Sequence, residues 1–571
     1  MTSSEDQAPV IVCGLGHIGY RVVELLQQLG TPVSVITLAA HSEWLAAVEA
    51  RGARVVLGDA RQDDRLREAG LAEARALVIV TDHDVVNIEI ALDAKRLRPE
   101  LPIVLRLFDQ NLARQMESGF DIRSASAVSA LAAPAFAGAA LGERTLGSFS
   151  LDGRTMVIGK HTVDPASPLA GLGISKMGRN GLHVVAHRPA AQHAAALPLT
   201  EALIAAGDQL FLLGEKSDWE RLNPAARPGF IPAAPPRSFA SPRRWGTALR
   251  RIWTGSSLSV RSIFVALNLV ILLSVFVFSR AMGLSLVDAL YFVLSTVTTI
   301  GYGDITLLKA PPLLKLYGCV IMLVGSATLA TLYSMVTGYV VAERFQQLLG
   351  RRRIPEGGHV VVVGAGNLGV RTLEELRHAG AAVSAVDKDE KGDFVATLRA
   401  TTPVVLGDAR SESVLREAGV ERAQAVVAVT GDDAVNLGVA LLAKKLNPNA
   451  RVVARLFDVG FARKVERALD VDVAMGSSLV AAPYFVASAY EGGVRAAFLS
   501  GGTLITVLEC PVGAERGGFT PARLRDEAGL QVLRVRTELG SPYRAVGDDE
   551  ELSASWTLLA ARVRGASSVF V

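Results

Sequence analysis

Two stretches of this 571-residue sequence repeat each other, one on each side of an apolar middle segment. Residues 14–19 (GLGHIG) return 350 positions later as residues 364–369 (GAGNLG). Residues 106–109 (RLFD) return 349 positions later as residues 455–458, with the same four letters. Matches at so constant a distance identify two copies of one module, and both copies are expected to adopt the same fold.

Each copy begins with the pattern of a dinucleotide-binding fold. A short apolar strand, at residues 10–13 and 360–363, runs into Gly-x-Gly-x-x-Gly and then into a helical stretch. In that context the glycines permit a tight turn and a close approach of phosphate to the helix N-terminus. Further apolar strands alternate with helical stretches, which predicts a parallel, doubly wound, Rossmann-like α/β sheet. The uncharged residues 124–142 are expected to form a buried or dimer-facing crossover helix.

The middle segment has the composition of an α-helical membrane domain. Residues 263–279 and 316–342 carry no charge, and each run is long enough to form a spanning helix, the first at the short end of the range. Between them, Ser285 and Asp288 have the Ser-x-x-Asp spacing of a helix start. The helical stretch that follows is too short to cross a bilayer, so we expect a re-entrant half-helix.

The loop after this half-helix has the composition of a potassium-selective filter, with the sequence Thr299, Ile300, Gly301, Tyr302, Gly303. Such a filter lines a narrow path with backbone carbonyls that replace the hydration shell of the ion. Gly301 and Gly303 permit the dihedrals that turn successive carbonyls toward one axis. K⁺ is therefore expected at the carbonyls of Thr299, Ile300, Gly301 and Tyr302. One chain supplies one loop, so a closed ring of carbonyls requires several copies of the chain.

A single glycine, Gly325, interrupts the middle of the second apolar run. Glycine weakens a helix, so we expect a gating hinge at this position. Close helix packing through a small residue is the alternative.

Charge and composition restrict the location and the partners of the chain. A net charge of +3 gives no reason to expect a nucleic acid partner. Arginines cluster before the first apolar run and after the second, which predicts a cell-membrane protein with both termini in the cytoplasm. Three cysteines lack the spacing of a metal site or a disulfide pair, and the polar start is not that of a signal peptide. Residues 223–244 are expected to form an extended Pro- and Arg-rich linker, and residues 245–253 either a short interfacial helix or more linker.

These motifs together resemble the prokaryotic potassium channels that have two membrane helices per subunit and RCK (regulator of potassium conductance) domains. The resemblance implies a homotetramer in a lipid bilayer, with a cytoplasmic gating ring of eight RCK modules. It also implies a small regulatory ligand, either NAD or NADH or else ATP or ADP, with a divalent cation as a further alternative. In this family the regulatory domains usually follow the pore, whereas here one copy precedes it.

The resemblance divides the chain into seven segments. They are an RCK N-lobe (1–145), its small α+β C-lobe (146–222), a linker (223–262), the pore domain (263–345), a short linker (346–357), a second N-lobe (358–491) and a second C-lobe (492–571).

The two copies differ at the position that binds a ribose in this fold. An acidic residue about 20 positions after the glycines accepts hydrogen bonds from the ribose hydroxyls. The second copy has Asp387 at this position, whereas the first has Thr37. We therefore expect the second copy to hold the main nucleotide site and to drive the gate.

The resemblance places Asp408 near an adenine and Arg455 near phosphates; capping and ion pairing at strand ends are the alternative roles of Asp408, Arg106 and Arg455. The residues expected at the second site are Gly364, Gly366, Asn367, Leu368, Gly369, Asp387, Asp408, Ala409 and Arg455. Those of a weaker first site are Gly14, Gly16, His17, Ile18, Gly19, Asp59 and Arg106, with His17 expected to face solvent rather than to bind a ligand.

Two other classes of protein are alternatives to a channel. A membrane-anchored nicotinamide-dependent oxidoreductase needs a general acid or base beside the nicotinamide, and the sequence offers no such group. A regulatory subunit of a potassium uptake transporter would leave the membrane helices and the filter unexplained. We therefore expect a channel without enzymatic activity.

Overall fold

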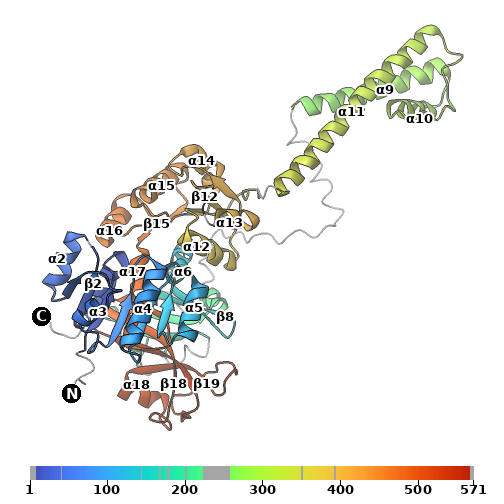
Figure 1. Ribbon diagram of the computed structural model, residues 1–571. Helices are drawn as coiled ribbons and strands as arrows, with labels where there is room; N and C mark the ends of the chain where they lie inside the picture. The colour runs from blue at the N-terminus through green and yellow to red at the C-terminus, as the bar shows by residue number, and fades with distance from the viewer. Residues whose placement is uncertain are drawn as a thin grey trace. The chain divides into compact units, whose positions relative to one another are not determined.

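The computed structural model describes residues 8–222, 258–348 and 352–565, apart from positions 40, 143–144, 166, 168, 175–176, 178–180, 200–201, 391 and 393. These residues form two compact units, one with both repeated modules and one with the middle segment (Figure 1). The predicted linker at 223–244 and the predicted interfacial helix at 245–253 lie outside the described residues.

Both modules contain the predicted six-stranded parallel sheet. The strand order is β3-β2-β1-β4-β5-β6 in the first copy and β13-β12-β11-β14-β15-β16 in the second, which is that of a Rossmann-like fold. The strands of the first sheet are β1 (Val10–Cys13), β2 (Val33–Thr37), β3 (Arg54–Leu57), β4 (Ala76–Ile79), β5 (Ile103–Arg106) and β6 (Ser124–Ser126). Those of the second are β11 (Val360–Val363), β12 (Val383–Asp387), β13 (Val404–Leu406), β14 (Ala425–Ala428), β15 (Arg451–Arg455) and β16 (Val473–Met475).

Helices follow the strands in the alternating order that the sequence predicts. The helices of the first copy are α1 (His17–Gln28), α2 (Ser42–Ala50), α3 (Asp63–Glu68), α4 (Asp84–Leu97), α5 (Gln110–Gly119) and α6 (Val128–Ala140). Those of the second are α12 (Asn367–His378), α13 (Val395–Thr401), α14 (Glu412–Glu417), the 3₁₀ turn η4 (Val420–Arg422), α15 (Asp433–Leu446), α16 (Val459–Ala468) and α17 (Ser477–Tyr490).

The crossover helices α6 and α17 each cover the sheet of the other copy. Phe136 of α6 belongs to the core formed with β11 and β14, whereas Phe485 of α17 belongs to the core formed with β1 and β4. The two helices also contact each other, and Figure 1 shows them side by side. The helix predicted at 124–142 is observed only over residues 128–140, because residues 124–126 form the edge strand β6; it is buried between the two modules of one chain.

Each copy also has a small C-lobe built on a four-stranded antiparallel sheet, with the orders β7-β8-β10-β9 and β17-β18-β20-β19. One face of each sheet contributes to a shared core, in which the rings of Phe211 and Phe498 lie 5.3 Å apart, and the other faces belong to separate clusters. The elements of the first lobe are β7 (Thr145–Leu151), β8 (Arg154–Thr162), β9 (His183–Arg188), β10 (Gln209–Glu215) and α7 (Lys216–Leu222). Those of the second are β17 (Val494–Ser500), β18 (Thr503–Pro511), α18 (Pro521–Ala528), β19 (Leu530–Arg536) and β20 (Thr557–Arg564).

The unit of the middle segment consists of helices α9 (Leu258–Met282), α10 (Leu286–Val297) and α11 (Pro312–Leu348). Ser285 caps α10 by accepting a hydrogen bond from the backbone N–H of Asp288 at 3.1 Å, as its spacing predicts. By length and composition, one stretch among the described residues, Pro312–Thr331, is long and apolar enough to cross a membrane; Asn268–Met282 and Leu286–Val297 are apolar but shorter.

Candidate functional site

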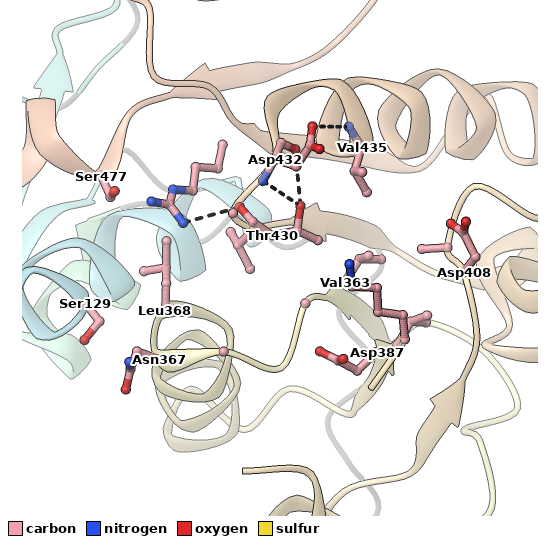
Figure 2. A pocket seen from close by; sticks show the side chains of 18 of the residues that line it. Ser129, Val363, Asn367, Leu368, Asp387, Asp408, Thr430, Asp432, Val435 and Ser477 are labelled. Carbon is pink, nitrogen blue, oxygen red and sulfur yellow. Dashed lines mark hydrogen bonds between the residues drawn. The ribbon is translucent and has the colours of Figure 1, made fainter. Parts of the chain in front are cut away.

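A cavity of about 590 Å³ lies at the carboxyl ends of the strands of the second sheet (Figure 2). This is the edge at which open α/β sheets bind their ligands. Most of the lining comes from the loops after β11 to β15, and a smaller part comes from the first module. The predicted second-site residues on its lining are Gly364, Gly366, Asn367, Leu368, Asp387, Asp408, Ala409 and Arg455.

The glycine loop is tight for a steric reason. Gly364 has a φ of +100°, which favours glycine. A Cβ atom on Gly369 would lie 1.7 Å from the carbonyl oxygen of Gly364, so only glycine fits there. The first copy has the same constraint, with 1.8 Å between a Cβ on Gly19 and the oxygen of Gly14. The third glycine thus supports the fold of both copies, whether or not a ligand binds.

Asp387 ends β12 beside this loop and lines the cavity. Its carboxylate accepts hydrogen bonds from the backbone N–H groups of Ala365, at 2.5 Å, and Asp389, at 2.9 Å. The side chain therefore holds the glycine loop in position and lies where a ribose would be bound in this fold.

Asp408 also lies on the lining of the cavity and is paired with Arg410. The carboxylate accepts the Arg410 guanidinium at 2.6 Å and the Arg410 backbone N–H at 2.9 Å. These hydrogen bonds lower the pKa of Asp408 to about 2, so the group stays ionised at neutral pH. Ion pairing, which is the alternative role of Asp408, is therefore present.

Arg455 is the last residue of β15, and Asn436 fixes its backbone through a hydrogen bond. The buried Asn436 amide donates to the carbonyls of Thr430 and Arg455, at 3.1 and 3.0 Å. The Arg455 guanidinium donates to the Thr430 carbonyl at 3.3 Å, which is the bond drawn in Figure 2. Burial lowers the pKa of Arg455, so the charge is held in a partly desolvated place.

The first module contributes Arg106, Phe108, Val128 and Ser129 to the same cavity. Arg106 is the counterpart of Arg455 and was expected at the first site, but the structure also places it on the lining of the second. Ser129 lies at the start of α6, which the exchange of crossover helices brings onto this module (Figure 2). The cavity is therefore built by both modules.

The corresponding place in the first copy has a different structure. The ring of His17 stacks on the ring of Phe457 from the second module, with 4.1 Å between centroids and 17° between planes. Trp44 packs edge-on against the same imidazole at 5.1 Å. His17 is solvent-exposed, as expected, although one face of its ring is covered by Phe457.

Two other predicted residues of the first copy have internal partners. Thr37 is buried and its hydroxyl donates to the carbonyl of Ala39 at 2.8 Å. Asp59 accepts the guanidinium of Arg61 at 2.7 Å, as Asp408 accepts that of Arg410. The Gly-Asp-Ala-Arg motif therefore has the same structure in both copies.

The loop after α10 has positive φ at alternate residues, with +63° at Thr299, +53° at Gly301 and +79° at Gly303. In the same unit, a Cβ atom on Gly325 would lie 3.1 Å from Cα and Cγ1 of Val297, at the end of α10. This close approach is the contact that the packing alternative for Gly325 requires.

Within the part of the chain that the structure describes, no group of three or more His, Cys, Asp or Glu side chains is arranged to hold a metal ion.

Comparison with known families identifies three ranges of the chain. Residues 10–125 and 360–476 match the TrkA-N domain, and residues 264–342 match the ion channel domain. The chain therefore consists of an ion-channel domain with a TrkA-N (RCK) domain before it and another after it. The resemblance to RCK channels is thereby confirmed.

Among the relatives, "Potassium channel protein 1" of Methanocaldococcus jannaschii is 27% identical over 39% of this chain and 66% of that protein. "Voltage-gated potassium channel Kch" of Escherichia coli is 27% identical over 30% of this chain and 42% of that protein. The chain thus spans less than two thirds of the length of these relatives. The solved "GsuK channel bound to NAD" shares the fold, with a TM-score of 0.50, 15% identity and coverage of 98% of this chain and 77% of that one.

Proposed function

We propose that this protein is a potassium-selective channel of the cell membrane, assembled as a homotetramer and gated by a nucleotide at the second module. The observation that carries the proposal is the filter loop, Thr299 to Gly303, between a short capped half-helix and a long apolar helix. Positive φ values at alternate residues of this loop support the proposal. In an extended chain successive carbonyls point to opposite sides, and these φ values turn them toward the same side, as a filter requires.

The regulatory part of the proposal rests on the cavity of the second module. It lies at the ligand-binding edge of the sheet, and Asp387 supplies the acceptor that a ribose needs. NAD is the first ligand to test, because the solved GsuK channel, which has the same fold, is bound to NAD. NADH, ADP and ATP are tested next. A ligand shifts the gate only through different affinities for the open and closed states, so binding and gating must be measured together.

Selectivity is tested in planar bilayers with opposed K⁺ and Na⁺ gradients. The current should reverse near the potassium equilibrium potential; a reversal midway between the two potentials would refute the proposal. Gly301→Ala should abolish selective current while the tetramer persists, because the added Cβ opposes a φ of +53°. Ile300→Val, which keeps a β-branched side chain, is the matched control and should retain selectivity.

Gly325 is proposed as the gating hinge of α11, with close packing on Val297 as the competing explanation. Gly325→Ala should change open probability without changing selectivity. The double variant Val297→Ala/Gly325→Ala removes the Cγ1 atom at 3.1 Å but keeps the Cα atom of residue 297 at the same distance. If the double variant restores normal gating, packing against the Val297 side chain explains the glycine; if the defect persists, the Val297 side chain is not its cause, as a hinge requires.

A further inference from the structure

The first module supplies part of the second module's cavity, and the contribution includes a charged side chain. Arg106 stands at the end of β5, and Phe108 follows two residues later. The Arg106 guanidinium lies over the Phe108 ring, 4.7 Å from its centroid, as that of Arg455 lies over Phe457 at 4.5 Å. Two counterpart arginines, one from each copy, therefore line one cavity in the same conformation.

Both guanidiniums have unused hydrogen-bonding capacity. The Nε–H groups of Arg106 and Arg455 are buried and have no hydrogen-bond partner among the described residues. Burial lowers the pKa of each side chain; Asp82 and Asp84 oppose this shift at Arg106, and Asp433 opposes it at Arg455, where the positive charge of Arg106 lowers the pKa further. The nearby carboxylates of Asp84 and Asp433 accept the backbone N–H groups of Phe108 and Phe457. The two guanidiniums thus place like charges on the lining of one cavity, on which the carboxylates of Asp387, Asp408 and Asp432 also lie, and a phosphate would compensate the guanidinium charges.

The protein fixes the backbone behind both arginines. Asn87 donates to the carbonyls of Thr81 and Arg106, at 3.1 and 2.9 Å, as Asn436 does for Thr430 and Arg455. Both asparagines are fully buried. A guanidinium whose main chain is fixed in this way loses less conformational entropy when it binds phosphate.

We propose that Arg106 and Arg455 bind the phosphates of one nucleotide together, so that the second site selects ligands with at least two phosphates. The inference rests on the proposed nucleotide site and specifies its ligand class. A guanidinium binds a phosphate through two parallel hydrogen bonds. A diphosphate, as in ADP or NAD, provides a separate phosphate for each arginine, whereas in AMP the two arginines must share a single phosphate. The first copy accordingly acts as half of a site.

The test is calorimetric titration of the full-length channel in detergent with ADP and, separately, AMP. Wild type should bind ADP at least about 10-fold more tightly than AMP, which corresponds to one charge-assisted hydrogen-bonding group. Arg106→Ala should weaken the binding of ADP by about 10- to 100-fold and the binding of AMP far less. The ratio of the two dissociation constants should therefore approach one. Arg106→Lys keeps the charge without the paired donors and should give an intermediate ratio. Arg114→Ala, an exposed arginine of α5 outside the cavity, should match wild type.

The outcomes separate this inference from the proposed function. If wild type binds ADP and Arg106→Ala binds it equally well, the two-arginine site is refuted and the nucleotide proposal stands. If wild type binds AMP as tightly as ADP, the selection for two phosphates is refuted. If wild type binds no nucleotide, both proposals fall. Because the ADP to AMP ratio is measured within each variant, a loss of folded protein changes the number of sites and leaves the ratio intact.

Discussion

At the end of the second strand the first copy has a buried Thr37, bonded to its own loop, whereas the second has Asp387, bonded to the glycine loop. At the first helical residue the first copy has His17, stacked on Phe457, whereas the second has Asn367, which lines a cavity together with Phe108. The glycines, the Asp-Arg pair and the buried asparagine are the same in both copies.

The comparison separates two kinds of residue in one motif. Features present in both copies, such as the steric requirement at Gly19 and Gly369, are explained by the fold alone. Features present only in the second copy coincide with the cavity. The Gly-x-Gly-x-x-Gly motif therefore predicts the fold, whereas the acceptor at the end of the second strand, Asp387, marks the copy with the cavity at which we propose a nucleotide.

The largest difference is expected between Asp387→Ala and Thr37→Ala. Asp387→Ala removes both the ribose acceptor and the support of the glycine loop, so nucleotide affinity should fall by about 10- to 100-fold. Thr37→Ala should leave affinity within about twofold, since its hydroxyl bonds only to Ala39. Binding is measured by calorimetry and open probability in bilayers. Loss of the response in Thr37→Ala with no effect of Asp387→Ala would reverse the roles of the two copies.

The fold was predicted more fully than the site. The predicted strands at 10–13 and 360–363 are observed as Val10–Cys13 and Val360–Val363, because short β-branched runs between turn residues specify parallel strands strongly. The exchange of α6 and α17 was not predicted, although the crossover helix was expected to be buried or dimer-facing. Both helices are apolar on all sides, which indicates burial on every face but does not specify which sheet is covered.

The composite cavity was missed for the same reason. Asp387 and Arg455 were found because they lie in the repeated module itself. Phe108 and Ser129 enter the site only through contacts between the copies, and those contacts have no sequence pattern. The available signal was the repeat: two modules with matching apolar helices can pack as a pseudo-twofold pair, in which each supplies residues to the other.

A second pair of variants examines what the copies share. Asn436→Ala and Asn87→Ala should each destabilise the protein by about 2–3 kcal/mol, because each removes a buried amide that donates to two backbone carbonyls; the Thr430 carbonyl keeps its second donor, Arg455. Thermal unfolding of the full chain measures the two losses of stability. Equal losses would show that the two asparagines stabilise their sheets to the same extent. A loss in only one copy would contradict the common architecture.

A third pair exchanges the differing residues. Asn367→His places a ring opposite Phe108 and should lower nucleotide affinity by several-fold, about 1 kcal/mol, because it narrows the cavity as His17 does against Phe457. His17→Asn should leave affinity unchanged and remove about 0.5–1 kcal/mol of stacking from the contact between modules. Tighter binding in Asn367→His would mean that a ring at this position stacks on the ligand instead.

The smallest effect is a pH dependence that, at the first helical residue, only the first copy can have, because it has His17 where the second has Asn367. Burial lowers the pKa of His17; Arg455, His41 and Arg21 act in the same direction, and Asp433 opposes them. A histidine whose pKa is lower in the folded state takes up its proton more readily when unfolded, so its contribution to stability falls as the pH drops below its ordinary value of about 6.5. Asn367 cannot titrate.

The excess thermal stability of wild type over His17→Asn should therefore be largest near pH 8 and should shrink toward pH 5. Thermal unfolding of the two full-length proteins across this range measures the difference, and other titrating groups cancel because both proteins contain them. Asn367→Gln serves as the control and should differ from wild type by a constant amount. A wild-type advantage that grows toward acidic pH would mean that the imidazolium, paired with Asp433, is the form that the folded protein stabilises.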